Sequence, residues 1–392
     1  MKKSIIFVIS RMSVGGAQKS LLAALGVLDY DKYDVTLYVR ENKIALIGEV
    51  PENVRVFVNE DPHDYEHSSL ARLRELGRMA LKAAGRRERA LSSEEKEKEA
   101  VYLSQVRYEL DSSTVLGREY DVAISYSDGP TCRFTAENVR AKKKIIFYLR
   151  STGAETPLHR KYLPLYDIIV TASVGARDHL ARQLPGCEEK LRVIPDWIDA
   201  EEIKKKASVD FNARTDAPLT LCTCGRMSFE KGFDIAVEAA RILKSDGVVF
   251  RWFFVGDGPQ RAAVEKAAAE NGVDEEIVFT GLLDNPFPYI KNCDLYIHTS
   301  REECLGNVIA EAMILSKAVV STDTVGAREQ ITDAVNGFLV ETDASAVARK
   351  IEELIGDAER VSRVLEELRI PSSLSDRERY RSQWSELLVQ VE

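Results

Sequence analysis

The segment "TSREECLGNVIAEAM", residues 299–313, carries two carboxylates, Glu303 and Glu311, with seven residues between them. The apolar run "DLYIHTS" before it is typical of a buried strand, and "NVIAEAMILS" has the spacing of a helix that begins at or near Asn307. Glu303 is therefore predicted on the loop, and Glu311 about one turn inside the helix. Carboxylates placed in this way can accept hydrogen bonds from sugar hydroxyls.

The predicted start of this helix also offers backbone donors. N–H groups at a helix start point outward, and together with the positive end of the helix dipole they can hold a pyrophosphate. An ordinary amphipathic helix, whose glutamate has no role in binding, is equally consistent with this sequence. The segment alone therefore leaves both interpretations open. The donors in question are those of Leu305, Gly306, Asn307 and Val308.

A second candidate is "GRMSFEKG", residues 225–232, which follows the strand-like run "LTLCTCG". Arg226 and Lys231 flank a loop at the carboxyl end of a parallel strand, where open α/β sheets bind ligands. A guanidinium fork and an ammonium point charge together suit a diphosphate. A charged surface loop is the alternative. The nearby "VGDGPQ", residues 255–260, is predicted to be a tight turn that supports the site without doing chemistry.

A third candidate is "SVGGAQ", residues 13–18, between the first predicted strand and the first predicted helix. Gly15 and Gly16 present no side chain there, so a phosphate or a sugar can approach the backbone N–H groups. A purely structural turn is equally compatible with the pair. The dinucleotide fingerprint G-x-G-x-x-G is missing, which disfavours a nicotinamide-dependent oxidoreductase.

The elements that must position these residues follow a repeated order of apolar strand, turn and helix. Continuous apolar strands that alternate with helices predict an α/β fold with parallel sheets covered on both faces. The pattern restarts after residue 210, which predicts two α/β domains at 1–196 and 197–370 and a C-terminal helical segment at 371–392, expected to pack across to the N-terminal domain.

Composition narrows the class of protein. The chain has 392 residues and a net charge of −9, which disfavours general nucleic-acid binding. Its six scattered cysteines are predicted to be buried thiols in a reducing cytoplasm, and no apolar run approaches the roughly 20 residues of a membrane span. Asp29 and Asp31 have the D-x-D form, but they follow a helix and are predicted to form a turn, so no metal site is expected.

One segment suggests contact with a membrane. Residues 70–91, "LARLRELGRMALKAAGRRERAL", have the pattern of a basic amphipathic helix. Such a helix can lie on an anionic membrane surface, which would place a cytoplasmic protein at the inner face of the cell membrane. A solvated helix packed on its own sheet is the alternative.

In order and spacing, "GGAQ", "GRMSFEKG", "VGDGP" and "ECLGNVIAEA" together resemble the retaining GT-B glycosyltransferases, specifically family GT4. The resemblance covers nearly the whole chain and is strongest from 221 to 343. It implies two Rossmann-like domains facing a central cleft. The C-terminal domain would bind a nucleotide-sugar, most often a UDP-sugar, and the N-terminal domain would receive the acceptor. It also implies no cofactor and no metal, because the nucleotide-sugar is a substrate.

The resemblance assigns roles to particular residues. Arg226 and Lys231 match the cations that hold the donor diphosphate, and Glu303 matches the acidic residue near the donor sugar. Glu311 matches the carboxylate that binds the ribose hydroxyls. The backbone of 305–308 matches groups that contact the sugar and the phosphate. Two further loops have counterparts in the family, namely Gly15 and Gly16 beneath the diphosphate and residues 281–285 at the base.

The chain departs from the family on the acceptor side. A histidine is common in the family after the strand "DVAISY", where this chain has Tyr126, Ser127 and Asp128, and again after the next strand, where it has Arg150. A frequent asparagine before the second domain is Asp196. The acceptor residues are therefore expected to be Tyr126, Asp128 and Arg150, without the usual histidine.

The expected reaction is metal-independent sugar transfer with retention, to a glycan or lipid-linked acceptor of a bacterial surface polymer. Arg226, Lys231 and helix N-termini would stabilise the leaving diphosphate, and Glu303, near the donor sugar, is the third predicted catalytic residue. Two alternatives keep the fold, namely a GT-B-type nucleotide-sugar epimerase and a non-catalytic partner subunit.

Overall fold

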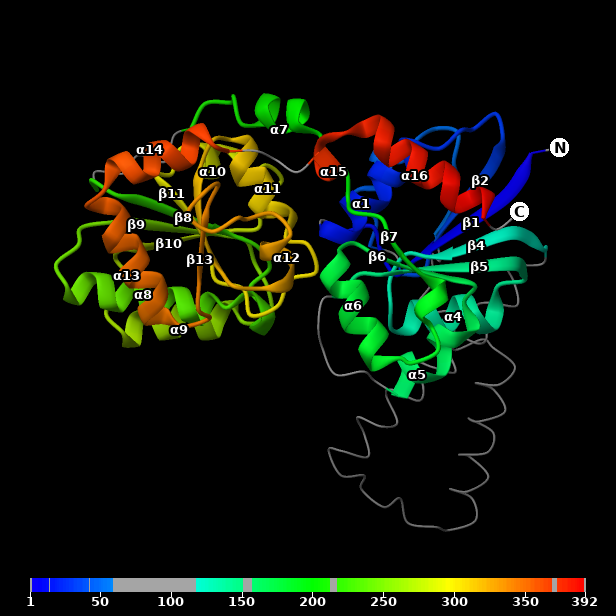
Figure 1. The fold of residues 1–392 in the computed structure, drawn as a ribbon, viewed down its shortest axis with the longest axis horizontal. Coiled ribbons are helices and arrows are strands. Elements are labelled where there is room, and N and C mark those ends of the chain that lie inside the picture. Colours follow the sequence, from blue (N-terminus) through cyan, green and yellow to red (C-terminus); the bar gives the residue numbers. More distant parts are fainter. Residues whose placement is uncertain are drawn as a thin grey trace, which may run out of the picture. The chain divides into compact units, whose positions relative to one another are not determined.

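The computed structural model describes residues 2–13, 15–41, 43–58, 118–150, 157–211, 217–368 and 372–390. The described residues form two parallel β-sheets with helices on their faces (Figure 1). They divide into two compact units. The first comprises the described residues within Met1–Tyr148, Glu155–Ile169 and Leu388–Glu392, and the second those within Leu149–Ala154 and Val170–Leu387. The basic segment 70–91 lies outside the described residues.

The first sheet has seven strands in the order β3-β2-β1-β4-β5-β6-β7. The strands are β1 (Lys3–Ile9), β2 (Tyr33–Val39), β3 (Arg55–Val58), β4 (Tyr120–Ser125), β5 (Ala141–Tyr148), β6 (Ile168–Thr171) and β7 (Leu191–Val193). The connecting helices are α1 (Gly16–Leu25), α4 (Pro130–Asn138), α5 (Pro157–Tyr162) and α6 (Val174–Gln183), with 3-10 turns η1 (Ile47–Glu49), η3 (Leu163–Leu165) and η4 (Glu188–Lys190). The predicted boundary at 196/197 falls after β7.

The second sheet has six strands in the order β10-β9-β8-β11-β12-β13. The strands are β8 (Thr220–Cys224), β9 (Arg251–Val255), β10 (Ile277–Gly281), β11 (Leu295–His298), β12 (Ala318–Thr322) and β13 (Phe338–Val340). The helical elements are α7 (Ala200–Lys206), η5 (Phe229–Lys231), α8 (Phe233–Ser245), α9 (Arg261–Glu270), α10 (Phe287–Lys291), α11 (Asn307–Ile314), α12 (Val325–Arg328), α13 (Ala344–Ile355), α14 (Ala358–Glu366), α15 (Ser372–Ser375) and α16 (Arg377–Val389).

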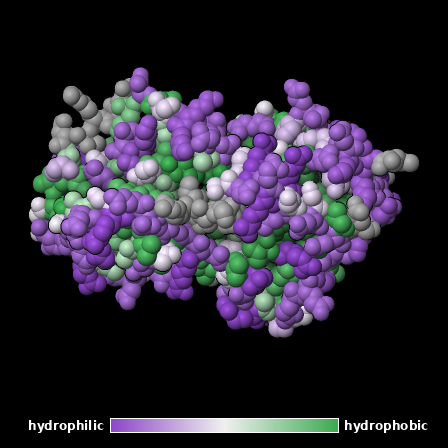
Figure 2. All heavy atoms as spheres, turned by 45° about the horizontal axis from the view of Figure 1, so that its top comes forward, coloured by the Kyte–Doolittle hydropathy of each residue, from purple (hydrophilic) through white to green (hydrophobic). Residues whose placement is uncertain are grey.

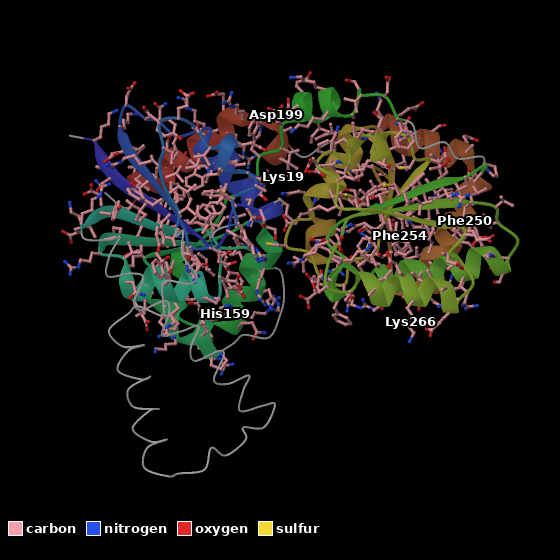
Figure 3. All side chains as sticks on the ribbon, turned by 180° about the vertical axis from the view of Figure 1, so that it is seen from behind. Lys19, His159, Asp199, Phe250, Phe254 and Lys266 are labelled. Atoms are coloured by element: carbon pink, nitrogen blue, oxygen red, sulfur yellow. The ribbon has the colours of Figure 1, made fainter. Side chains whose placement is uncertain are left out.

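The strands of the second sheet carry apolar residues on both faces because alternate residues enter two different cores. Along β9, Trp252 and Phe254 belong to one buried cluster, whereas Phe253 and Val255 belong to another. A parallel sheet covered by helices on both faces requires this pattern. Phe254 lies within the interior and Lys266 on α9 points outward (Figure 3).

The face of the molecule in Figure 2 is mostly hydrophilic, with smaller apolar areas between the polar side chains. In the described ranges, no helix combines the length and the apolar character that crossing a bilayer requires. The Asp29–Asp31 stretch forms the predicted turn, in which Asp29 Oδ1 accepts the Asp31 N–H at 3.1 Å and Asp29 pairs with Lys32 at 3.1 Å. Among the described residues, no group of three His, Cys, Asp or Glu side chains is placed to hold a metal ion.

Each sheet contains a point where the strand order reverses. In the first sheet, β1 and β4 are neighbours, and in the second sheet, β8 and β11 are neighbours. Chains that leave two such strands run to opposite sides, which opens a crevice at their carboxyl ends, and ligands of open α/β sheets bind there. In the second sheet these two strand ends lead directly into "GRMSFEKG" and "REECLG".

Candidate functional site

The loops after β8 and β11 are joined to each other along their length. The N–H of Arg301 donates to the carbonyl of Glu230 at 2.7 Å, and Thr299 Oγ1 donates to the carbonyl of Lys231 at 3.3 Å. Gly232 has φ of +62°, and a Cβ there would lie 2.0 Å from the carbonyl oxygen of Thr299. Only glycine satisfies both conditions, so the "EKG" sequence allows the two loops to meet.

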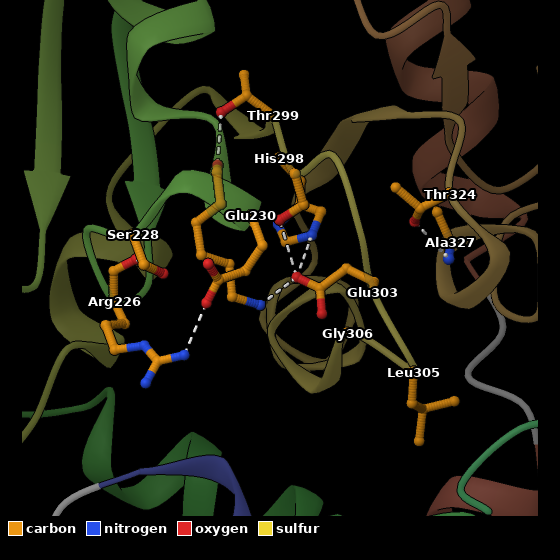
Figure 4. Close-up of polar contacts among 12 residues, drawn as sticks. Arg226, Ser228, Glu230, His298, Thr299, Glu303, Leu305, Gly306, Thr324 and Ala327 are labelled. Carbon is orange, nitrogen blue, oxygen red and sulfur yellow. Dashed lines mark hydrogen bonds and ion pairs between the residues drawn. The ribbon is translucent and has the colours of Figure 1, made fainter. Parts of the chain in front are cut away.

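This junction brings three charged or titratable side chains together. The Lys231 ammonium hydrogen-bonds Glu303 Oε1, and His298 Nε2 lies 3.0 Å from the same oxygen (Figure 4). Ser300 Oγ donates to it at 2.8 Å. The Glu303 side chain is 7% exposed and that of His298 3%, whereas that of Lys231 is 26% exposed. The ammonium is therefore the most accessible member of the cluster.

Glu303 is held in its charged form. Burial by itself raises the pKa of this carboxyl, but the positive charge of Lys231 and the hydrogen-bonding and charge contributions of His298 outweigh it. The net result is a pKa of Glu303 well below its usual range. A buried anion beside a partly exposed cation is consistent with both predicted roles, but the structure shows the two residues bound to each other.

Arg226 lies at the start of the same loop and is much more exposed. Its guanidinium donates to Glu230 Oε1 at 2.7 Å, and its side chain is 61% exposed. Burial raises the pKa of Glu230, yet hydrogen bonds from Ser228 and Arg226 leave it below the ordinary value. Exposed pairs of this kind contribute little to stability, so a stronger anion such as a phosphate can replace Glu230 at small cost.

A residue without a predicted role, Arg301, fixes this loop. Its guanidinium donates to both carboxylate oxygens of Asp234, at 2.7 and 2.5 Å, and to the carbonyl of Phe229 at 2.9 Å. It also lies 4.3 Å from the centre of the Phe229 ring. A bidentate pair of this geometry is directional as well as charged, so Arg301 orients the loop that carries Lys231.

The "VGDGP" turn supports the loop from the other side. The N–H of Met227 donates to the carbonyl of Asp257 and the N–H of Gln260 to the carbonyl of Met227, both at 2.9 Å. Gly256 has φ of +141°, and a Cβ there would lie 1.9 Å from the carbonyl oxygen of Gly225. The turn is therefore architecture beside the site, as its sequence indicates.

Helix α11 begins at Asn307, as the sequence predicts. Gly306, with φ of +76°, is the N-cap, and Asn307 is the first helical residue. The Asn307 side chain instead donates to Asp196 Oδ2 at 2.7 Å. The Gln330 side-chain amide donates to the carbonyls of Leu305 and Gly306. These two bonds fix the carbonyl groups at this turn. The backbone conformation at the start of α11 then sets the orientation of the N–H groups of 305–308.

The remaining members of this segment differ in accessibility. Leu305 is buried, Val308 is half-buried, and Glu311 is half-buried inside α11 near the phenol of Tyr296. Burial raises the pKa of the Cys304 thiol to about 12, despite hydrogen bonds to the Ala172 backbone and Ser173. Cys304 is therefore a neutral packing residue.

In the first unit, the two predicted glycines lie at the start of α1, after β1. Gly15 is the N-cap in an extended conformation, and Gly16 opens the helix. A Cβ on Gly16 would meet no atom within 4 Å, and one on Gly15 would meet only the side chain of Gln18, at 2.6 Å. The Gln18 amide donates to the Arg11 carbonyl at 3.0 Å. The entry of α1 is therefore open to a ligand, but the backbone geometry alone does not select one.

The acceptor-side candidates differ from expectation. Tyr126 is fully buried; its hydroxyl hydrogen-bonds Ser20 at 2.8 Å, and its ring stacks on Phe147 with 4.6 Å between centroids. In this structure it packs α1 against the sheet and does not face solvent, so its expected acceptor contact is corrected. Arg150 is exposed.

Asp128 has a partner that the motif comparison did not find. His159, on α5, places Nε2 3.3 Å from Asp128 Oδ2 and lies edge-on to the Tyr148 ring. An imidazole therefore does reach the carboxyl end of β4, but it comes from a helix instead of a strand end. Sequence reasoning missed it because His159 lies 31 positions away from Asp128 and in no recognised motif.

Comparisons with known proteins found similarity to glycosyltransferases. Residues 218–357 match the family described as glycosyl transferases group 1. Among curated proteins, the chain is 29% identical over 54% of its length to the lipopolysaccharide core biosynthesis glycosyltransferase LpsE of Rhizobium meliloti. It is 26% identical over 88% of its length to the N-acetylgalactosamine-N,N'-diacetylbacillosaminyl-diphospho-undecaprenol 4-alpha-N-acetylgalactosaminyltransferase of Campylobacter jejuni. The matches span 60% of the first relative and 87% of the second.

Solved structures show the same fold. The Anabaena HepE protein, determined in complex with UDP and glucose, superposes with a TM-score of 0.69 at 20% identity, covering 98% of this chain and 99% of that one. Sucrose-phosphate synthase from Thermosynechococcus elongatus gives a TM-score of 0.71 at 16% identity, covering 100% and 99%. The predicted fold class, GT-B with two Rossmann-like domains built on parallel sheets, is confirmed.

Proposed function

We propose that this chain, which has the GT-B fold and whose residues 218–357 match the glycosyl transferases group 1 family, transfers a sugar from a nucleotide-sugar to a hydroxyl acceptor. A UDP-sugar is the first candidate donor. The observation that carries the proposal is the arrangement after β8 and β11. Two cations, Arg226 and Lys231, a buried carboxylate, Glu303, and the start of α11 come from neighbouring strand ends where the sheet order reverses.

Each part of the arrangement suits a part of the donor. Arg226 and Lys231 would bind the diphosphate oxygens, the first as a fork and the second as a point charge. The backbone N–H groups at the start of α11 would bind the phosphate and the sugar. The hydrogen bonds and ion pairs of the Glu303 carboxylate with Lys231, Ser300 and His298 all use Oε1, which leaves Oε2 for a donor-sugar hydroxyl. Glu311, half-buried inside α11, is proposed to hold the ribose.

The proposed chemistry is transfer with retention at the anomeric carbon, without a metal or a separate cofactor. The bond between the anomeric carbon and the diphosphate oxygen breaks, and the acceptor oxygen attacks from the same face. The leaving phosphate oxygen takes the proton of the acceptor hydroxyl, so no strong general base is required. Negative charge grows on that leaving oxygen, and Arg226, Lys231 and the α11 start would stabilise it.

A lipid-linked or glycan acceptor in a bacterial surface polymer is the proposed second substrate. The name of the Campylobacter relative contains a diphospho-undecaprenol acceptor, and that of the Rhizobium relative refers to lipopolysaccharide core biosynthesis. A membrane-linked acceptor fits an enzyme that works at the inner face of the membrane, held there by residues 70–91. Flotation with anionic vesicles tests this: changing Arg74, Arg78 and Lys82 to Glu should abolish flotation, and unchanged flotation would reject the membrane contact.

A direct test of the donor combines binding with turnover. Thermal unfolding is measured with UDP-, GDP-, ADP- and CMP-sugars, and the stabilising one is then assayed for nucleotide release with lipid-linked and glycan acceptors. We expect UDP-sugars to stabilise the wild type and not Lys231→Ala. Lys266→Ala is the matched control, because it removes an exposed lysine on α9. Failure of every nucleotide-sugar to stabilise the folded protein would refute the proposal.

A further inference from the structure

The cluster formed by Lys231, Glu303 and His298 has a consequence for how a diphosphate binds. Glu303 is a buried anion, and Lys231 supplies the positive charge that balances it. This lysine is also the cation proposed to bind the donor. A diphosphate that draws the ammonium toward itself therefore removes charge compensation from a carboxylate with almost no access to water.

Leaving that carboxylate uncompensated would be costly, because an unpaired buried charge destabilises a protein by several kcal/mol. The site contains one other group able to take up positive charge, the imidazole of His298, which lies 3.0 Å from Glu303 Oε1. Imidazole is the side chain that ordinarily changes charge between about pH 5 and 8. A proton on His298 would turn the existing contact into a charge-assisted hydrogen bond.

Among the described residues, titratable and charged groups near His298 come from its own strand, a neighbouring strand and the loops. Tyr296, on the same strand, stacks near the imidazole with 6.5 Å between centroids, and burial raises its pKa well above the ordinary value, so it stays neutral. The neighbouring strand β12 places Ser321 in register with His298. From the loops, the charged or titratable groups are Glu303, Lys231 behind it, and the neutral thiol of Cys304.

We propose that binding of a nucleoside diphosphate by Lys231 is coupled to the uptake of one proton from solvent by His298, which then balances Glu303. His298 is thus a positioning residue: it keeps Glu303 charged and in place while Lys231 serves the donor. The inference rests on the proposed function, because it requires a diphosphate at this site. Its sign is fixed, since a protonation that accompanies binding makes affinity fall as pH rises, by up to about tenfold per pH unit.

The test is titration calorimetry with UDP near neutral pH, in PIPES, MOPS and Tris buffers, whose ionisation heats differ. The dependence of the binding enthalpy on buffer gives the number of protons taken up. We expect uptake by the wild type to exceed that of His298→Gln by a substantial fraction of one proton. Glutamine keeps an amide near the position of Nε2 but does not titrate, and any change in the ionisation of UDP itself is common to both proteins.

A second imidazole provides the control. His179→Gln removes a part-buried histidine on α6, outside the cluster, and should take up protons like the wild type. Thermal unfolding of each variant verifies folding, and His298→Asn provides a second non-titrating variant. If UDP binds and proton uptake is the same in wild type and in both His298 variants, the inference is overturned while the donor class stands. If UDP does not bind the wild type at all, the donor class fails and the inference with it.

Discussion

Replacing Lys231 by methionine should destabilise the protein as well as inactivate it, because the lysine balances a buried charge. Methionine keeps the aliphatic length and removes the ammonium from Glu303, whose side chain is 7% exposed. Breaking a buried ion pair from one side costs about 3–5 kcal/mol. Glu303 keeps the contacts with Ser300 at 2.8 Å and His298 at 3.0 Å, so the lower end, about 3 kcal/mol, is expected.

The assay is thermal or urea unfolding of the unit that carries the site, followed by circular dichroism. A loss of about 3 kcal/mol corresponds to a fall in Tm of roughly 6–12 °C for a domain of this size. The double variant Lys231→Met/Glu303→Gln should recover most of that stability, because it removes the uncompensated charge as well. Its donor-dependent turnover should stay about 10²–10³-fold low, since the cation is still missing. The double variant would thereby separate the effect on stability from the effect on turnover.

The lowered pKa of Glu303 also predicts how the stability difference between wild type and Lys231→Met depends on pH. A carboxyl whose folded pKa is depressed contributes stability above its unfolded pKa, near 4.3, and loses that contribution as pH falls toward the folded value. The stability gap between wild type and Lys231→Met should therefore narrow as the solution is acidified. Equal stabilities at neutral pH, or a gap that persists unchanged into acid, would refute the assignment of Lys231 as the counter-ion of Glu303.

Three further predictions concern Arg226, Gly256 and Tyr126. Arg226→Ala should change the free energy of unfolding by less than about 0.5 kcal/mol, because its pair is exposed, yet lower turnover about 10²–10³-fold; normal turnover would exclude it from the diphosphate site. Gly256→Ala should destabilise by more than about 2 kcal/mol, since its Cβ meets the Gly225 carbonyl, whereas Gly225→Ala, with open space around its Cβ, should be far milder; similar losses would contradict the packing. Tyr126→Phe should cost about 1 kcal/mol of stability through the bond to Ser20 and leave the acceptor KM unchanged; a raised KM would restore its predicted acceptor role.

The fold and the general position of the site could be predicted because both depend on local pattern. Apolar strands such as "FRWFFVG" alternate with helices, and this alone predicts a covered parallel sheet whose carboxyl ends carry the ligand loops. Arg226, Lys231 and Glu303 follow two such strands, and the structure brings Lys231 and Glu303 into direct contact. Which strands are neighbours, however, is a long-range property. The adjacency of β8 and β11 is such a property, and periodicity does not contain it.

Side-chain partners were less accessible to sequence reasoning. Tyr126 and Asp128 are separated by two positions, yet the first is in the core and the second pairs with His159 on α5. The environments of these two side chains differ because each leaves the end of β4 in a different direction. The partner of Asp128 also comes from α5, which follows later in the chain. No local rule contains that information.

His298 shows what a usable signal would have been. A single histidine in an apolar strand is ordinarily a core residue, and "LYIHTS" alone does not distinguish it. Yet His298 is the last residue of β11, at the carboxyl edge where ligand loops begin, and only four residues separate it from Glu303. A loop carboxylate at this edge is expected to be buried, so that water is excluded from the donor. A titratable side chain next to that carboxylate can then serve as its charge partner. Two groups thus contact one anion, namely the Lys231 ammonium and the His298 imidazole. Lys231 is the more exposed of the two, and the proton proposed for His298 would balance Glu303 while Lys231 binds a phosphate.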